Sequence, residues 1–137
     1  MGRAFGVLCL NCDYSKESLL GVGGLYFSLE NVISNLHHTK RKAINDILNN
    51  HDVVEVPFGV NPEYSAKIYR CSKCEGLSSR FYVKIEYDDN QIYETTFKCT
   101  KCRTVLEMLD ENENLENYSC PNCKMPMLGI SSFICWD

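Results

Sequence analysis

The fold is decided by four segments in which two residues separate a pair of cysteines: Cys9-Leu10-Asn11-Cys12, Cys71-Ser72-Lys73-Cys74, Cys99-Thr100-Lys101-Cys102 and Cys120-Pro121-Asn122-Cys123. Two cysteines at this spacing reach one metal ion across a tight turn, and structural zinc sites are closed by four protein ligands. Eight cysteines therefore predict two structural zinc ions, without which we do not expect the chain to fold. Cys135 is left over among apolar neighbours, and we expect it to be a buried thiol outside both sites.

The order of the four segments allows two pairings. Cys102 and Cys120 are separated by seventeen residues, a spacing typical of four-cysteine zinc sites. We therefore favour one site made by the third and fourth segments and one made by the first and second. The alternative joins the second segment to the third and the first to the fourth. It requires the chain to close a loop of more than one hundred residues, which costs more conformational entropy.

The segments between the cysteines read as short strands and one helical region. Alternating or apolar runs predict strands near residues 4–8, 66–70, 105–108 and 127–134. A hairpin is expected from Phe81–Tyr87 and Gln91–Phe97, joined by Asp88-Asp89-Asn90. Apolar residues at helical spacing predict one helix over 29–49, or two joined near 37–39, with Ser28 and Thr39 as N-caps. The fold class that follows is a small, metal-bound α+β protein.

The succession of strand, cysteine turn, strand and second cysteine turn resembles the zinc ribbon (rubredoxin-like zinc-β). Tyr69 to Gly76 and Tyr118 to Cys123 are similar to its knuckles, and Cys9 to Phe27 is similar to small bacterial zinc-ribbon proteins with a Leu-Gly-x-Gly loop. The resemblance implies two zinc-ribbon-like β units and a bacterial source. The first unit is expected over 1–80 with a helical insert at about 28–50, and the second over 81–137 with the hairpin and a C-terminal ribbon. The usual Gly or Tyr after the last cysteine is replaced by Asp13, Glu75, Arg103 and Lys124.

Composition places the chain among cytoplasmic proteins that do not enter membranes. Clustered Cys-x-x-Cys pairs hold metal in a reducing compartment, where disulfides are rare. No run approaches the roughly 18–20 apolar residues that cross a bilayer, and Met1 to Cys9 is too short and polar for a secretory signal. The net charge of −4 argues against bulk electrostatic binding of nucleic acid. Residues 67–103 nevertheless carry eight Lys or Arg against five Asp or Glu, a local charge of +3.

Catalysis is not expected from this sequence. Catalytic zinc keeps an open coordination position and usually has histidine among its ligands. The three histidines, His37, His38 and His51, all lie in or beside the helical region and form no His-Glu-x-x-His pattern. Thiol redox chemistry would place Cys-x-x-Cys at the start of a helix, whereas these pairs follow strands. The sequence therefore predicts a protein that binds a partner.

Two binding hypotheses follow. In the first, the protein is an adaptor or regulatory subunit whose zinc scaffold presents the helical insert and the apolar residues Leu25, Tyr26 and Phe27 to a protein partner. In the second, a basic face binds nucleic acid, with Tyr82 and Tyr93 as stacking groups. The residues of that face are Arg70, Lys73, Arg80, Lys84, Lys98, Lys101 and Arg103. We favour the protein partner because the chain is acidic overall.

Overall fold

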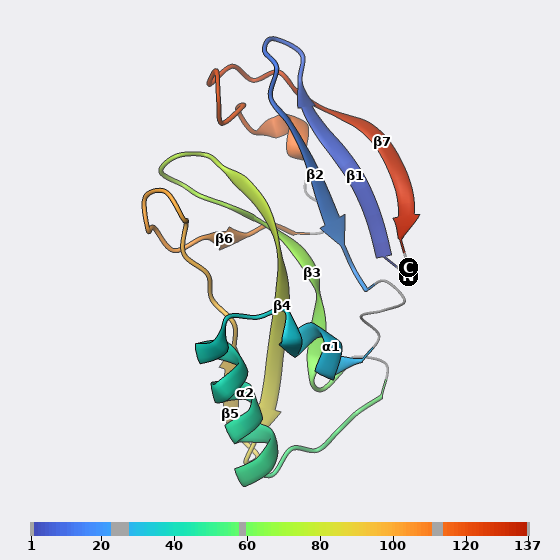
Figure 1. Cartoon of the computed structure of the whole chain (residues 1–137), viewed down its shortest axis with the longest axis vertical. Helices are drawn as coiled ribbons and strands as arrows, with labels where there is room; N and C mark the ends of the chain where they lie inside the picture. The colour runs from blue at the N-terminus through green and yellow to red at the C-terminus, as the bar shows by residue number, and fades with distance from the viewer. Residues whose placement is uncertain (1, 23–27, 58–59, 111–113, 137) are drawn as a thin grey trace.

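The computed structural model describes residues 2–22, 28–57, 60–110 and 114–136, with side chains described as far as residue 130 in the last strand. It is a small α+β structure built from two antiparallel sheets and two helices (Figure 1). The predicted partner residues Leu25, Tyr26 and Phe27 lie outside the described residues, as does the side chain of Cys135. In the described part of the chain, no helix is long and apolar enough to cross a membrane.

The first sheet joins the two ends of the chain. Its strand order is β2 (Ser15–Leu20), β1 (Gly2–Cys9) and β7 (Leu128–Trp136), all antiparallel (Figure 1). The register pairs Gly2 with Trp136 and Cys9 with Leu128, so β7 runs the whole length of β1. Phe5, Val7 and Cys9 alternate toward the core and are buried, as the period of two in a strand requires.

The second sheet has the order β5 (Gln91–Glu94), β4 (Leu77–Tyr87), β3 (Glu63–Arg70) and β6 (Glu107–Met108). The predicted β4–β5 hairpin is confirmed, with its turn at Asp88-Asp89-Asn90. The returning strand ends at Glu94 instead of Phe97, because the Thr95 hydroxyl accepts the Val83 N–H at 3.0 Å where a ladder carbonyl would otherwise lie.

The predicted boundary between residues 80 and 81 falls within β4 of this sheet. β4 continues through both residues, and its partner β3 pairs with it from Glu63↔Lys84 to Arg70↔Leu77. Likewise, the first sheet combines strands from the start and the end of the chain. The two sheets therefore do not divide the chain into consecutive halves, since each is assembled from segments on both sides of the expected boundary.

Two helices cover one face of the second sheet (Figure 1). α1 (Leu29–Ser34) and α2 (His38–Asn50) correspond to the two-helix alternative. Ser28 occupies the expected N-cap position of α1, but its side chain makes no capping hydrogen bond. The second helix is capped by His37 instead of Thr39: the His37 ring nitrogen accepts the Thr39 N–H at 3.4 Å. The buried helical residues are Val32, Ile33, Ile44 and Ile47. Together with Leu36, which lies between the helices, they pack on Val83 and Ile85 of β4. Most of the apolar face of the helices is therefore core.

Candidate metal centres

Each Cys-x-x-Cys segment forms the same backbone turn, which we call a knuckle. The N–H of the first cysteine donates to the carbonyl five residues later, at distances of 2.8–3.0 Å in all four knuckles. In the second, third and fourth knuckles, the residue after the second cysteine also donates to the carbonyl of the first, at 2.8–2.9 Å. These bonds hold both sulfurs of a knuckle on one side of the turn, where they can share a ligand.

The residue after the second cysteine adopts the left-handed conformation in those three knuckles. Glu75, Arg103 and Lys124 have φ of 65°, 59° and 65°, a region in which a side chain costs on the order of 1–2 kcal/mol and which glycine enters freely. The turn therefore forms without the glycine common in the zinc-ribbon family.

The eight cysteines form two clusters of four, and the pairing we favoured is wrong. Cys9, Cys12, Cys120 and Cys123 make the terminal centre, and Cys71, Cys74, Cys99 and Cys102 make the inner centre. The terminal centre joins residues 108 positions apart in the chain. Loop closure grows only logarithmically with length, so extending a loop from about 20 to about 100 residues costs only about 1.4 kcal/mol more. Pairing of β1 with β7 along eight positions easily offsets this.

The sulfur positions fit a tetrahedral metal ion. Within each cluster all four sulfurs lie within 4.8 Å of one another. Sulfurs facing each other across the two knuckles are separated by 3.6 and 3.7 Å in the terminal centre and by 3.2 and 3.5 Å in the inner centre. Metal–sulfur bonds of about 2.3 Å place tetrahedral sulfurs about 3.8 Å apart, whereas a disulfide would bring them to about 2.05 Å. All eight cysteines are free thiols.

In the terminal centre, the two knuckles support each other through asparagines. The Asn11 side-chain amide donates to Cys123 Sγ at 3.5 Å, and that of Asn122 donates to Cys12 Sγ at 3.7 Å. Asn11 with the Met125 N–H lowers the pKa of Cys123 to about 6, while burial raises that of Cys9 to about 11. Such outer contacts orient metal ligands and stabilise the thiolate charge.

In the inner centre, the third knuckle supplies the supporting contacts itself. The Thr104 hydroxyl lies 3.4 Å from Cys102 Sγ, and the hydroxyl and N–H of Thr104 lower the pKa of Cys102 to about 6. The backbone N–H groups of Cys102 and Lys101 lower the pKa of Cys99. Thus each centre contains at least one cysteine poised as a thiolate, the form that binds metal.

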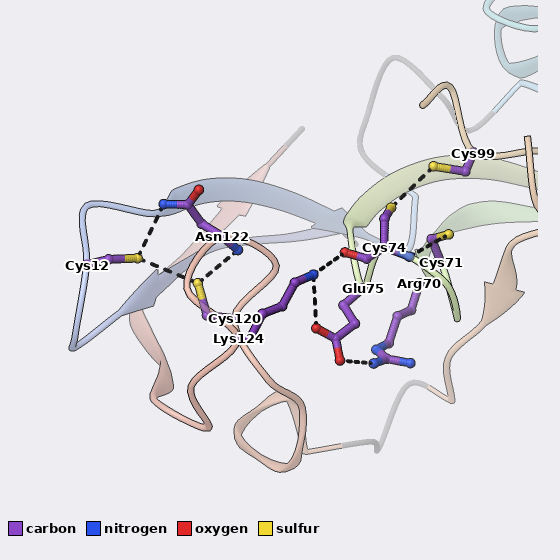
Figure 2. A network of polar contacts seen from close by, with 9 residues as sticks. All are labelled: Cys12, Arg70, Cys71, Cys74, Glu75, Cys99, Cys120, Asn122 and Lys124. Atoms are coloured by element: carbon purple, nitrogen blue, oxygen red, sulfur yellow. Dashed lines mark hydrogen bonds and ion pairs between the residues drawn. The ribbon is translucent and has the colours of Figure 1, made fainter. Parts of the chain in front are cut away.

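A polar bridge joins the two centres (Figure 2). Lys124 Nζ donates to the Cys74 carbonyl at 3.0 Å and lies 3.2 Å from Glu75 Oε2, in an ion pair that is not aligned as a hydrogen bond. The other carboxylate oxygen of Glu75 is 3.5 Å from Arg70, whose guanidinium lies 4.9 Å from the centre of the Tyr118 ring. Glu75 of the inner centre and Lys124 of the terminal centre, both in the left-handed conformation, thus form an ion pair.

The structure separates the predicted basic face into several environments. Arg80 and Lys98 line a hollow beside the start of α2, and Arg80 with Lys101 lines a second hollow between the two centres. Arg70 belongs to the bridge, and neither hollow includes the other three, Lys73, Lys84 and Arg103. The expected stacking role of Tyr82 is wrong: its ring is buried and its hydroxyl donates to Glu94 at 2.7 Å.

Sequence reasoning missed Lys16 and Lys124, which line the second of these hollows. It also missed a local sign of the correct pairing. The third residue of the knuckle is Asn in both terminal knuckles and Lys in both inner ones.

Comparison of the chain with family models, curated proteins and solved structures returned no match.

Proposed function

We propose that this protein is a non-catalytic interaction module, stiffened by two structural zinc ions, that binds a protein partner as an adaptor or regulatory subunit. Four thiolates at tetrahedral spacing match the ligands and geometry that zinc prefers in structural sites. In this proposal each centre joins two knuckles as in a zinc ribbon. Purified protein should contain two zinc ions per chain, whereas iron with a visible colour would contradict the assignment.

The donor set supports a binding role over a catalytic one. Four cysteines complete the coordination of a zinc ion and leave no position for substrate or water. In the described part of the chain, neither cluster contains a histidine or carboxylate that could act as a weaker, exchangeable ligand. The centres therefore serve to fix the knuckles and the residues those knuckles carry.

The observation that supports the protein partner is an apolar surface on the terminal centre, which we call the terminal rim: Leu10, Met125 and Met127. Their exposed fractions are 70%, 47% and 38%. The three are neighbours, because the Leu10 N–H donates to the Met127 carbonyl at 2.9 Å and the Met127 N–H to that of Met125 at 2.8 Å. Leu10 lies between two metal ligands in the sequence, so metal binding holds it in place. Rigidly exposed apolar side chains beside adaptable methionines favour protein contacts.

Site-specific photocrosslinking tests this proposal. A photoreactive residue at Leu10 should capture one protein in source cells. The same residue at Val54, which is 74% exposed but belongs to none of the four knuckles, should not. With that partner purified, Leu10→Ser should weaken binding by about tenfold, the loss expected when a buried interface side chain is truncated, while the zinc content stays at two. Equal capture at both positions, or unchanged affinity in Leu10→Ser, would refute the rim as the binding surface.

A further inference from the structure

A cationic hollow of about 440 Å³ lies between the start of α2 and the segment that follows β5. Its positively charged lining residues are Lys40 from α2, Arg80 from β4 and Lys98. His37, Asn35 and Ser79 add polar groups. Among the described residues that line it there is no Asp or Glu, so the hollow concentrates positive charge on a chain whose net charge is −4.

Two of these cations are held together by an aromatic ring. Lys40 Nζ lies 5.1 Å from the centre of the Phe97 ring, and Arg80 Cζ lies 5.7 Å from it. Phe97 is itself fixed by an edge contact with Tyr69, with ring centres 5.2 Å apart. Each contact is a cation–π attraction between the charged group and the face of the ring. The ring thus brings two like charges from distant parts of the sequence to one place, an arrangement that a bound anion would stabilise.

A second hollow, of about 290 Å³, shares Arg80 with the first. It adds Lys16 from β2 and the knuckle residues Lys101 and Lys124, again with no acidic residue among its described lining positions. This hollow is also lined by Cys74 and Cys99 of the inner centre. Part of its positive charge would therefore offset the negative charge of those thiolates when metal is bound. The described lining of the first hollow includes no cysteine. Neighbouring thiolate charge therefore does not explain why Lys40 of α2 lies beside Arg80 and Lys98.

We propose that the two hollows form a binding site for the phosphate backbone of a single-stranded nucleic acid, with Lys40, Arg80 and Lys98 as its principal contacts. Six cations in two adjoining hollows suit a chain of phosphates better than one phosphate. Lys40 and Arg80 are half-buried in the first hollow, which favours a flexible single strand over a stiff duplex. Phe97 acts as a positioning residue for Lys40 and Arg80, since its ring is already in contact with both. The site is separate from the terminal rim and does not depend on it.

The test measures binding of a fluorescent twelve-nucleotide oligo-dT or oligo-U to the metal-loaded full chain by anisotropy. Lys40→Gln and Arg80→Gln should each weaken binding by about tenfold, the loss expected for a charge-assisted contact. The dependence on salt should become shallower by about 0.7 for each phosphate contact removed. Matched controls are Lys42→Gln on α2 and Lys84→Gln on β4, which line neither hollow and should change affinity by less than about twofold.

The proposal is overturned by no oligonucleotide binding at low salt, and equally by equal loss of affinity in the hollow variants and their controls. AMP and inorganic phosphate serve as competitors. Displacement of the oligonucleotide by AMP at equal concentration would assign the site to a small phosphate ester and refute the proposal of a single-stranded nucleic acid. If Arg80→Gln fails to retain two zinc ions, Lys98→Gln replaces it, because the Lys98 side chain is exposed and its loss should leave the core intact.

Discussion

The two metal centres are built from the same knuckle but differ in what surrounds it. The inner centre joins knuckles 25 positions apart at the end of one sheet, and Lys73 and Lys101 occupy the third position of its turns. The terminal centre joins knuckles 108 positions apart, with Asn11 and Asn122 in those positions and an apolar rim outside. One backbone turn thus carries two kinds of surface. The side chains within the turn decide which partner chemistry each centre presents.

The largest expected effect concerns how far unfolding extends through the protein when one of the two centres is lost. Apparent binding of structural zinc is worth on the order of 10–16 kcal/mol at pH 7, comparable with the whole stability of a domain. Cys120→Ser should unfold the first sheet (β2, β1 and β7) but leave the helices packed on β4, because that core cluster contains none of the described residues of the first sheet. Hydrogen exchange should show β1 unprotected while Val83 and Ile85 keep their protection.

The unfolding caused by Cys71→Ser should extend further than that caused by Cys120→Ser. Ile68 and Leu77, which flank the second knuckle, are buried in the same cluster as Phe5 and Val7 of β1. Loss of the inner centre should therefore lower protection in both sheets. This account is contradicted if Cys120→Ser removes the hydrogen-exchange protection of Val83 and Ile85. It is also contradicted if Cys71→Ser leaves the protection of β1 unchanged.

A smaller effect distinguishes the supports of the two centres. Asn11→Ala removes the amide that stabilises the Cys123 thiolate, and loss of such an outer contact typically costs about 10–100-fold in metal affinity. Titration with a competing chelator should then release one of the two zinc ions about tenfold more readily. Lys101→Ala, the matching position of the inner centre, should leave release nearly unchanged. Equal effects would show that the asparagines have no special role.

The left-handed knuckle residues offer a still smaller test. Arg103 is exposed and has φ of 59°, so Arg103→Gly should stabilise the zinc-loaded protein by about 1 kcal/mol through relief of strain. Arg103→Ala keeps the Cβ and should gain nothing. Lys124→Gly relieves the same strain but also removes the bridge to Cys74 and Glu75, so its melting temperature should rise less. A larger rise for Lys124→Gly would argue against the bridge.

The smallest effect lies outside both centres, where α2 meets the β4–β5 turn. Asp88 is 2.6 Å from His51 Nδ1 and accepts the Asp52 N–H at 3.0 Å. The hydrogen bond from His51, followed by that from Asp52, holds the pKa of Asp88 below its ordinary value. A lowered carboxyl pKa contributes stability above the unfolded-state value, and that contribution is lost as pH falls through the folded-state value.

Asp88→Asn should therefore melt slightly below the unmodified protein near neutral pH. The difference should begin to shrink as pH falls below about 4, the ordinary Asp pKa, and should vanish below the lowered folded-state pKa. Asp89→Asn, the next residue of the same turn, is the control. A difference that persists undiminished in acid would exclude the ionised carboxylate as its cause.

The sequence was sufficient to predict the eight clustered cysteines, the helical region and the β4–β5 hairpin, since each depends on local spacing or periodicity. It left open whether the helical region holds one helix or two. It did not predict β2, because Lys16 and Glu17 have little preference for strands. This strand forms as the hairpin partner of β1 and buries Ser18. The gathering of Lys16, Lys40 and Lys124 beside Arg80 depends on how sheets and helices pack together, which no local pattern contains.

The pairing of the knuckles failed for a different reason. Sequence distance was given more weight than its logarithmic cost justifies, while strand pairing between the two ends of the chain was left out. The matching Asn and Lys positions were the available signal. They are short-range features whose meaning becomes clear only once Asn11 is seen to donate to Cys123.

The pairing of the ligands is tested most directly by the zinc content of two double variants, measured by elemental analysis of purified protein. The first double variant combines Cys9→Ser and Cys120→Ser. Both changes fall in the terminal centre, so the inner centre should keep one zinc ion per chain. In Cys99→Ser with Cys120→Ser, each centre loses a ligand, so the protein should retain none. The reverse result, no zinc in the first variant and one ion in the second, would contradict the two centres described here.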